Sequence, residues 1–260
     1  MAELRKHPLT NDWIMIASHR QGRPQMPKDY CPFCPGSGKV PEDYDVYKYD
    51  NDFPALSPNP PAPDDLATDF FETAPCYGKC EVSLYSPQRT VTLPELPTSH
   101  IVKLVNLWVE RYEALAADPQ IKYVFIFENR GDVVGVTMPH PHGQIYGYPF
   151  LPKKLELEVE NARAYQQEKG RCLFCDMLDA EVADGRRVIF RTEHFTVFLP
   201  FFSEYPYGVY IMSNAHRSNI AQFTPEEREQ RRARRQAAER PVSPCVGRFF
   251  LPLFQILTAV

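Results

Sequence analysis

The chain has 260 residues and a formal net charge of −4, with 43% hydrophobic and 24% charged residues, which are values typical of a globular protein. The mildly acidic balance argues against a protein whose main task is holding a nucleic-acid backbone. No apolar run reaches the roughly 18 residues of a membrane span, and the N-terminus lacks the apolar stretch of a signal peptide. We therefore expect a cytoplasmic protein that binds neither nucleic acid nor membrane.

Hydrophobic periodicity and turn residues predict an α+β fold of short strands and few helices. The 26 prolines favour loops over long helices, and residues 57–69 are expected to form a polar loop. The predicted elements, in chain order, are a strand over Trp13–Ala17, a strand over Cys80–Tyr85, a helix capped by Ser99 and running to Ala117, a strand over Lys122–Phe127, a strand containing Gln144–Phe150, a helix over Leu155–Lys169, one or two strands within Val188–Leu199, and a strand over Gly208–Ser213.

Four of the seven cysteines form two C-x-x-C pairs, Cys31 with Cys34 and Cys172 with Cys175. An odd cysteine count without a signal peptide indicates reduced thiols, and a C-x-x-C pair is then half of a metal site or a redox pair. The first pair follows a Pro-rich loop rather than a thioredoxin-like strand-to-helix turn, which favours zinc. Two buried free thiols are the alternative.

The two C-x-x-C pairs also begin two similar stretches of chain, which suggests an internal duplication. Superposing Ser86 on Ser213 places Arg89 opposite His216. We therefore expect two tandem halves, each an antiparallel sheet with flanking helices, the second one incomplete. The expected divisions are an N-terminal half over 1–170, a partial C-terminal half over 171–230 and an Arg-rich, then apolar tail over 231–260. The abrupt change in composition at Arg231 suggests a frameshift or truncation.

The motif with the most specific chemistry is His140-Pro141-His142-Gly143-Gln144. In an extended strand, alternation places His140, His142 and Gln144 on one face. A neutral imidazole is a good nucleophile near neutral pH, and attack on phosphorus gives a labile phosphoramidate. Gln144 cannot titrate, but its amide can hydrogen-bond a phosphoryl oxygen. Because water is then poorly activated, the residues favour nucleotidyl transfer to a second phosphate over hydrolysis.

This motif, the upstream C-x-x-C and the repeated layout resemble the galactose-1-phosphate uridylyltransferases of the histidine-triad superfamily. The resemblance runs from about Leu4 to about Gln230 and is most specific from Asn129 to Phe150. It implies that His142 attacks the α-phosphorus of UDP-glucose and that the resulting UMP-histidine passes UMP to galactose 1-phosphate in the Leloir pathway. It also implies that Gln144 orients the uridylyl phosphate and that the protein is a homodimer.

The resemblance carries over further contacts to substrate, residue by residue. Arg20 and Arg23 match a pair that reaches the substrate from the partner subunit, Val40 would line the uracil pocket, and Thr137 replaces a serine that contacts phosphate. The full set of expected substrate-binding residues is Arg20, Arg23, Val40, Asn51, Asp52, Asn129, Gly135, Val136, Thr137 and Gln144.

For metals, the resemblance implies a zinc site made by Cys31, Cys34 and His140. The family's fourth ligand, a histidine, falls at Arg89, and a guanidinium cannot ligate zinc. The second half offers an incomplete quartet of Cys172, Cys175 and His216. Glu158 matches a carboxylate of a second family metal site, for Zn²⁺ or Fe²⁺, whose histidine partners are missing; without the family, it is one exposed acid on a Glu-rich helix.

Two other functions are compatible with this sequence. A dinucleotide tetraphosphate phosphorylase of the same superfamily also has Gln at the third motif position, although the Arg20, Arg23 and Asn51-Asp52 matches favour the uridylyltransferase. The other function, from a different class, is that of a truncated zinc-binding remnant without full activity. It is considered because the C-terminal segment that should carry sugar contacts in the family is expected to be missing here.

Overall fold

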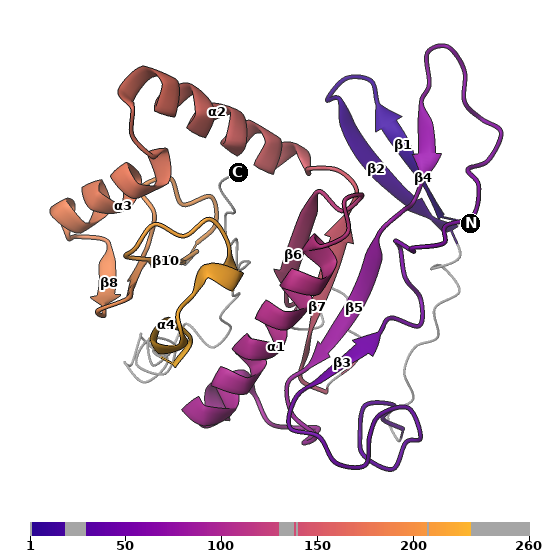
Figure 1. The fold of residues 1–260 in the computed structure, drawn as a ribbon, viewed down its shortest axis with the longest axis horizontal. Coiled ribbons are helices and arrows are strands. Elements are labelled where there is room, and N and C mark those ends of the chain that lie inside the picture. The colour runs from indigo at the N-terminus through magenta and orange to yellow at the C-terminus, as the bar shows by residue number, and fades with distance from the viewer. Residues whose placement is uncertain (1, 19–29, 130–137, 139, 207, 230–260) are drawn as a thin grey trace. The chain divides into compact units, whose positions relative to one another are not determined.

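The computed structural model describes residues 2–18, 30–129, 138, 140–206 and 208–229 of the chain. They form a mixed α/β fold with three antiparallel sheets (Figure 1). Its elements are β1 (Ala2–His7), β2 (Asp12–Ala17), β3 (Tyr47–Asp50), β4 (Thr73–Pro75), β5 (Lys79–Leu84), the 3₁₀ turn η2 (Leu93–Glu95), α1 (Thr98–Ala116), β6 (Tyr123–Phe127), β7 (His142–Tyr148), α2 (Lys153–Lys169), α3 (Leu173–Asp184), β8 (Val188–Arg191), β9 (Phe195–Phe198), β10 (Tyr210–Ser213), the 3₁₀ turn η4 (Ile220–Gln222) and α4 (Pro225–Glu229).

The chain divides into two compact units. The first contains residues 1–91 and 107–157, and the second contains residues 92–106 and 158–260, so that the boundary passes through α1 and through α2. No helix in the described ranges combines the length and the apolar character needed to cross a membrane.

The first sheet of the first unit has the strand order β2-β1-β4. β1 pairs antiparallel with both neighbours, from Ala2 opposite Ala17 to His7 opposite Asp12 on one side. Glu3 is 2% exposed in this central strand, and its carboxylate accepts hydrogen bonds from Asp64 N (2.8 Å) and Arg5 Nε (2.6 Å). A buried carboxylate needs such donors, and these bonds attach the polar loop around Asp64 to β1.

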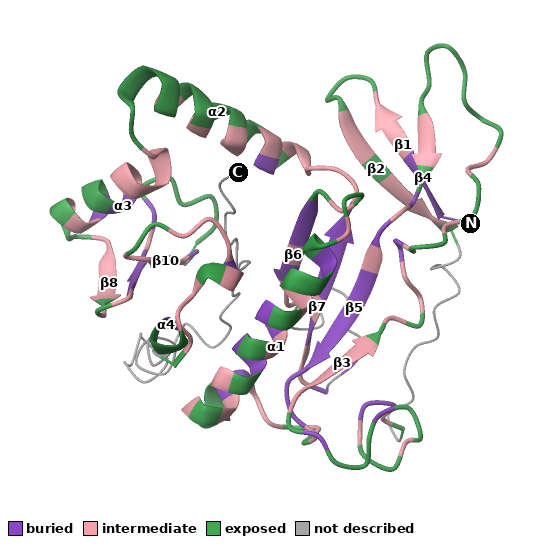
Figure 2. Ribbon diagram, viewed as in Figure 1, coloured by how far each residue is buried: buried purple, intermediate pink, exposed green. Residues whose placement is uncertain are grey.

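The second sheet, β3-β5-β7-β6, carries His142 and Gln144 on β7, one of its two central strands. β5 and β7 pair in antiparallel register from Lys79 opposite Gly147 to Leu84 opposite His142, and Figure 2 shows both as largely buried. Strands flanked on both sides satisfy their backbone groups within the sheet. Residues placed on β7 are therefore held by hydrogen bonds along both edges of the strand.

The C-terminal part of α1 packs on this sheet through polar as well as apolar contacts. Trp108 Nε1 donates to Ser83 Oγ at 3.3 Å, and Arg111 donates two hydrogen bonds to Glu81, Nε to Oε2 at 2.9 Å and Nη2 to Oε1 at 2.8 Å. Glu81 is 1% exposed, so the guanidinium neutralises a carboxylate that is out of water. The bidentate pair thus fixes where the helix crosses β5.

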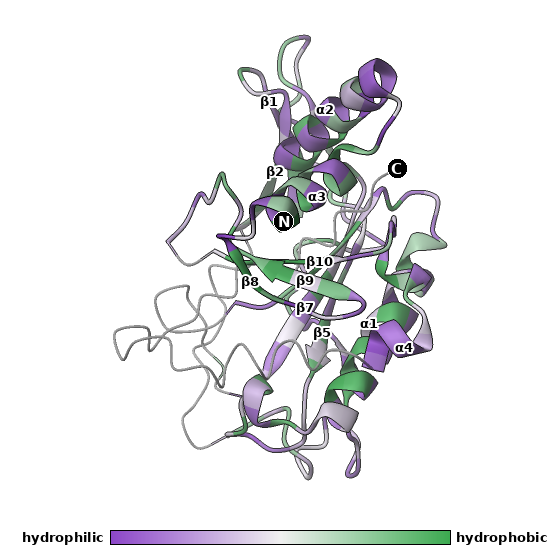
Figure 3. Cartoon of the chain, turned by 90° about the vertical axis from the view of Figure 1, so that its left-hand side faces the viewer, coloured by the Kyte–Doolittle hydropathy of each residue, from purple (hydrophilic) through white to green (hydrophobic). Residues whose placement is uncertain are grey.

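The second unit contains the three-stranded sheet β10-β9-β8, whose central strand β9 is buried and apolar (Figure 3). The buried Glu181 of α3 accepts hydrogen bonds from Arg187 Nε and from Phe201 N, each at 2.7 Å. Gly185 ends α3 in the left-handed conformation, with φ of 71°, which glycine adopts without strain.

The predicted strands and the two predicted helices lie where periodicity placed them, within a few residues, and residues 57–69 form no helix or strand. One detail was wrong: α1 begins at Thr98, with Ile101 N donating to Pro97 O at 3.1 Å, so Ser99 lies inside the first turn instead of capping it. β1, β3, β4 and α3 were not predicted. The proposed tail over 231–260 lies outside the described residues.

Candidate active site and metal centre

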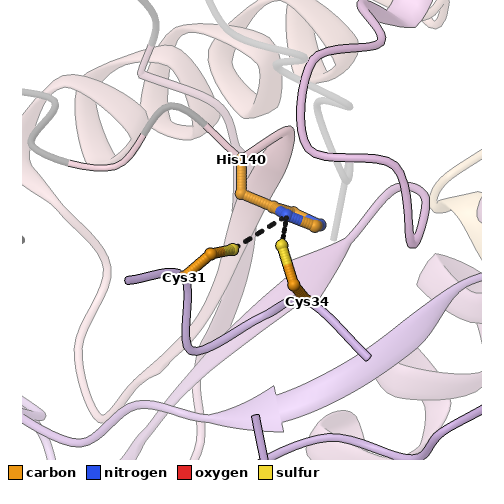
Figure 4. Close-up of side chains that lie close together, drawn as sticks. All are labelled: Cys31, Cys34 and His140. Atoms are coloured by element: carbon orange, nitrogen blue, oxygen red, sulfur yellow. Dashed lines mark hydrogen bonds between the residues drawn. The ribbon is translucent and has the colours of Figure 1, made fainter. Parts of the chain in front are cut away.

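Three predicted zinc ligands come together although His140 is more than 100 residues from the two cysteines in the chain. His140 Nδ1 lies 3.4 Å from Cys31 Sγ and 3.7 Å from Cys34 Sγ (Figure 4). Tetrahedral zinc, with bonds of about 2.3 Å to sulfur and about 2.0 Å to nitrogen, separates its ligand atoms by roughly 3.5–3.8 Å. The three donor atoms therefore fit a metal of this kind, and Cys31, Cys34 and His140 could hold one.

The orientation of His140 is set by its other ring nitrogen. Nε2 lies 2.7 Å from the carbonyl oxygen of Ser86 and so carries the proton of this hydrogen bond. Tyr44 stands beside it and donates to the carbonyls of Phe33, at 2.6 Å, and Ser86, at 3.2 Å. A backbone carbonyl that accepts from one ring nitrogen leaves the lone pair of the other for a metal. Nδ1 faces both sulfurs and is the atom that would ligate a metal here.

The pKa shifts of His140 and Cys34 indicate a neutral imidazole next to the two cysteines. Burial lowers the pKa of His140, which keeps its ring uncharged at neutral pH. Burial, together with the neighbouring Cys31, raises the pKa of the Cys34 thiol to about 11, whereas the positive charge of Arg89 acts in the opposite direction. Arg89 also contributes to the lowering of the His140 pKa. Arg89 therefore acts on the cluster as a cation, not as a fourth ligand.

His142, the expected nucleophile, is the first residue of β7 and is partly buried. Its Nδ1 lies 2.8 Å from the carbonyl oxygen of His140. Because a carbonyl only accepts, Nδ1 carries the proton and Nε2 carries the lone pair. The Phe33 ring meets the His142 ring edge-on, with centroids 6.0 Å apart. The imidazole is thus held in one tautomer by the His140 carbonyl and contacts the Phe33 ring, and its lone pair lies on Nε2.

Gln144 follows two residues later on the same strand, so its side chain leaves β7 on the face that also carries His142. Its Oε1 accepts a hydrogen bond from the Tyr146 hydroxyl at 2.8 Å. The intervening Gly143 is required by packing: a Cβ there would collide with the Tyr85 hydroxyl and approach Ser83 Oγ and Phe127 O to 3.1 Å each. His140 itself lies two residues before β7 begins.

Three expected substrate residues lie close in sequence to β3: Val40 precedes this strand, and Asn51 and Asp52 follow it directly. Asn51 Oδ1 accepts from Phe53 N at 2.9 Å, and Asp52 accepts from Lys39 Nζ and from the Tyr49 hydroxyl, each at 2.8 Å. Val40 is 7% exposed and packs in a cluster with Phe33, Tyr44, Val82, Leu84 and Met138, against which Cys31 also packs. Val40 therefore belongs to the same apolar cluster that borders the metal ligands.

Of the six remaining predicted substrate residues, Asn129 lies within the described part of the chain. Asn129 is exposed just after β6. Five of them lie outside the described residues: Arg20, Arg23, Gly135, Val136 and Thr137.

The second unit brings together Cys172, Cys175 and His216. Cys175 Sγ lies 3.2 Å from His216 Nδ1, and the three donor atoms lie within 4.8 Å of one another. The local structure differs from that of the first cluster, because Cys172 precedes α3 and Cys175 lies in its first turn. Glu158 is partly buried on α2. Among the described residues, no metal-type cluster includes Glu158.

Two partners of the motif were missed by sequence reasoning. Tyr44 and the Ser86 carbonyl orient His140, but neither a tyrosine 96 residues away nor a backbone acceptor leaves a recognisable pattern. Tyr146 had a usable signal, because the alternation that aligns His142 with Gln144 continues to it.

Comparison with known proteins places this geometry in a family. Residues 1–152 match the family model described as galactose-1-phosphate uridyl transferase, N-terminal domain, and residues 158–238 match the corresponding C-terminal domain. The chain is 39% identical over 231 residues to a galactose-1-phosphate uridylyltransferase of Thermotoga maritima, covering 88% of this chain and 72% of the relative. The enzyme of Rattus norvegicus is 30% identical, with 87% and 64% covered.

Solved structures give the same relationship. A uridylyltransferase structure, 31% identical, superposes with a TM-score of 0.79 over 87% of this chain and 71% of its own. An ADP-glucose phosphorylase from Arabidopsis thaliana, solved with bound ADP-glucose, is 24% identical and has a TM-score of 0.65 over 88% and 73%; it shares the fold. By sequence and by structure, the chain belongs to the galactose-1-phosphate uridylyltransferase family.

Proposed function

We propose that the chain transfers UMP from UDP-glucose to galactose 1-phosphate, with His142 as the nucleophile. The observation that carries this proposal is the 2.8 Å contact between His142 Nδ1 and His140 O, which places the ring proton on Nδ1 and the lone pair that would attack phosphorus on Nε2. In the first step Nε2 bonds to the α-phosphorus while the bond from phosphorus to the glucose 1-phosphate oxygen breaks. The modified imidazole becomes cationic, and its Nδ1 proton stays hydrogen-bonded to the His140 carbonyl oxygen, which stabilises that charge.

The second step reverses the first with a different acceptor. A phosphate oxygen of galactose 1-phosphate attacks the same phosphorus, UDP-galactose leaves, and His142 returns as a neutral imidazole. No proton has to be supplied or removed, because both the leaving group and the acceptor are phosphate anions. Gln144 donates its amide N–H groups to a non-bridging phosphoryl oxygen and provides no base to activate water.

The remaining substrate contacts follow the family assignment. We assign the ribose or base to Asn51 and Asp52, the uracil pocket to Val40, and phosphate or backbone contacts to Asn129, Gly135, Val136 and Thr137. Arg20 and Arg23 are assigned to the substrate of a partner subunit in a homodimer. The bonds of Asp52 to Lys39 and Tyr49 support the first assignment, since they hold this carboxylate in a fixed position.

We assign Zn²⁺ to Cys31, Cys34 and His140, where it would crosslink the two segments and so stabilise the strand that carries His142. We assign a second ion to Cys172, Cys175 and His216, in keeping with two tandem halves over 1–170 and 171–230, and none to Glu158.

Metal analysis of three variants tests these assignments. Cys31→Ser should lose one equivalent of zinc and Cys172→Ser another, while Cys76→Ser, at a buried thiol outside both clusters, should lose none. Equal zinc in all three variants would contradict the assignment.

Isotope exchange tests the transfer function. A ping-pong enzyme moves label from glucose 1-phosphate into UDP-glucose in the absence of any second sugar phosphate. We expect this exchange in the wild-type chain and none in His142→Asn. Absence of exchange, with phosphorolysis of diadenosine tetraphosphate in its place, would favour the phosphorylase; absence of both activities, with intact zinc, would favour a non-catalytic metal-binding chain.

A further inference from the structure

Tyr146 contacts the amide on which the proposed transfer depends. It lies two residues beyond Gln144 on β7, 5% exposed, opposite Cys80 on one neighbouring strand and Phe125 on the other. Its hydroxyl donates to Gln144 Oε1 at 2.8 Å. No step of the proposed reaction uses the Tyr146 hydroxyl directly. Its effect on the reaction would therefore be exerted through Gln144.

A glutamine amide has two unlike ends, and only one of them suits a phosphoryl group. Nε2 offers two N–H donors, whereas Oε1 offers lone pairs that repel a phosphoryl oxygen. A 180° rotation about the last side-chain bond exchanges the two ends with little change in shape. A tyrosine hydroxyl can donate to Oε1 or accept from Nε2, but its own proton reaches an acceptor on this amide only in the first arrangement, which leaves the N–H groups to face outward.

The Tyr146 ring is itself held in place. Its ring meets that of Phe127 edge-on, with centroids 5.1 Å apart at 82°, and lies 6.0 Å from that of Tyr148. A buried tyrosine hydroxyl that lost its acceptor would carry a desolvation cost. The ring packing and the hydroxyl together therefore favour one orientation of the Gln144 amide.

We propose that Tyr146 is a positioning residue that holds the Gln144 amide with its N–H donors toward the uridylyl phosphoryl group. The role rests on the proposed function, in which that amide stabilises phosphoryl charge during both transfer steps. Without the hydroxyl, the amide samples the orientation that presents Oε1 to the phosphate. Because the stabilised charge develops in the transition state, kcat falls and KM for UDP-glucose changes little.

A double-mutant cycle in the full chain tests this role. We expect Tyr146→Phe to lower kcat roughly 3- to 10-fold, the range of one ordinary hydrogen bond, and to have no further effect in the Gln144→Ala background. Tyr148→Phe removes the same atom from the next tyrosine on this face of β7 and is the matched control, with kcat unchanged. An equal loss from Tyr146→Phe in both backgrounds, or no loss, would overturn the proposal.

A second measurement is independent of turnover. The side-chain amide signals of Gln144, assigned by their disappearance in Gln144→Ala, should shift in Tyr146→Phe and stay in place in Tyr148→Phe in nuclear magnetic resonance spectra. A chain that shows this shift but transfers no UMP would contradict the proposed function alone. Unshifted Gln144 signals in Tyr146→Phe would contradict the positioning role, whether or not the chain is active.

Discussion

The His142 ring shows how a single backbone contact selects the chemistry of a residue. With Nδ1 directed at the His140 carbonyl, the proton lies on Nδ1 and the lone pair on Nε2, which is the nitrogen that attacks phosphorus in the proposed mechanism. One neighbour, His140, thereby serves two purposes: its ring faces the cysteines, and its carbonyl oxygen orients His142. The metal cluster and the nucleophile are consequently linked through the backbone of one residue.

Gly143 should be intolerant of any side chain. In Gly143→Ala the new Cβ would meet the Tyr85 hydroxyl and two further oxygen atoms, and overpacking of this kind costs about 2 kcal/mol of unfolding free energy. Denaturant unfolding of the variant measures the loss. Adding Tyr85→Phe removes the hydroxyl from the crowded position and should recover part of the stability. A Gly143→Ala chain as stable as the wild type would show that the strand relaxes without cost.

At the scale of single residues, the sequence indicated which residues form the candidate site better than it indicated their hydrogen-bond partners. The alternation of His142 and Gln144 was readable, and the grouping of Cys31, Cys34 and His140 followed from family resemblance. The acceptor for His140 was not readable, because the carbonyl of Ser86 is the same group that every residue carries. Arg89 was recognised as unable to ligate, and the structure adds that its charge acts on both Cys34 and His140.

Among the elements, α1 is joined to β5 by a bidentate ion pair between Arg111 and the buried Glu81. Arg111→Ala would leave Glu81, 1% exposed, without its bidentate partner, and breaking such a pair from one side costs ~3 kcal/mol. The exposed Glu110, whose carboxylate lies 3.6 Å from Arg111, is the matched control, and Glu110→Ala should change stability by less than about 0.5 kcal/mol. Equal effects of the two substitutions on the unfolding midpoint would argue against the pair.

Strand prediction succeeded where alternation was clear and failed where charge interrupts it. β6 consists entirely of β-branched and aromatic residues, and β5 alternates Cys80, Val82 and Leu84 with more polar residues. β1 contains Glu3, Arg5 and Lys6, so it has the composition of a polar segment, although its first residues are buried between β2 and β4. α3 was missed because a C-x-x-C pair suggested the same turn as the first pair, whereas here it begins a helix.

For the molecule as a whole, acid should weaken the first unit through Glu3. The Asp64 N–H and then Arg5 hold the pKa of the Glu3 carboxyl below its ordinary 4.5. A pKa lower in the folded than in the unfolded chain contributes stability above pH 4.5, and that contribution disappears as the pH falls through the folded-state pKa. Glu3→Gln should therefore lose stability at neutral pH and show a flatter acid limb in unfolding experiments. Glu42→Gln, at an exposed site, should keep the wild-type pH profile.

The division into two units and the match to two family domains describe the chain at its largest scale. The first unit holds His142, Gln144, Tyr146 and the first cysteine cluster, and the hydrogen bonds described above for these residues lie within it. The mild acidity of the composition is compatible with an enzyme that acts on small molecules. Composition could not predict that the site residues gather in the first unit, because that grouping depends on contacts between distant segments.

The central claim, that His142 carries UMP between two sugar phosphates, is tested most directly by trapping the intermediate. The chain is incubated with UDP-glucose labelled at the α-phosphorus, quenched in base, and examined for protein-bound label. We expect label that is stable in base, released by acid as phosphoramidates are, discharged by galactose 1-phosphate, and absent from His142→Asn. Protein without label, or label that persists in His142→Asn, would contradict the claim.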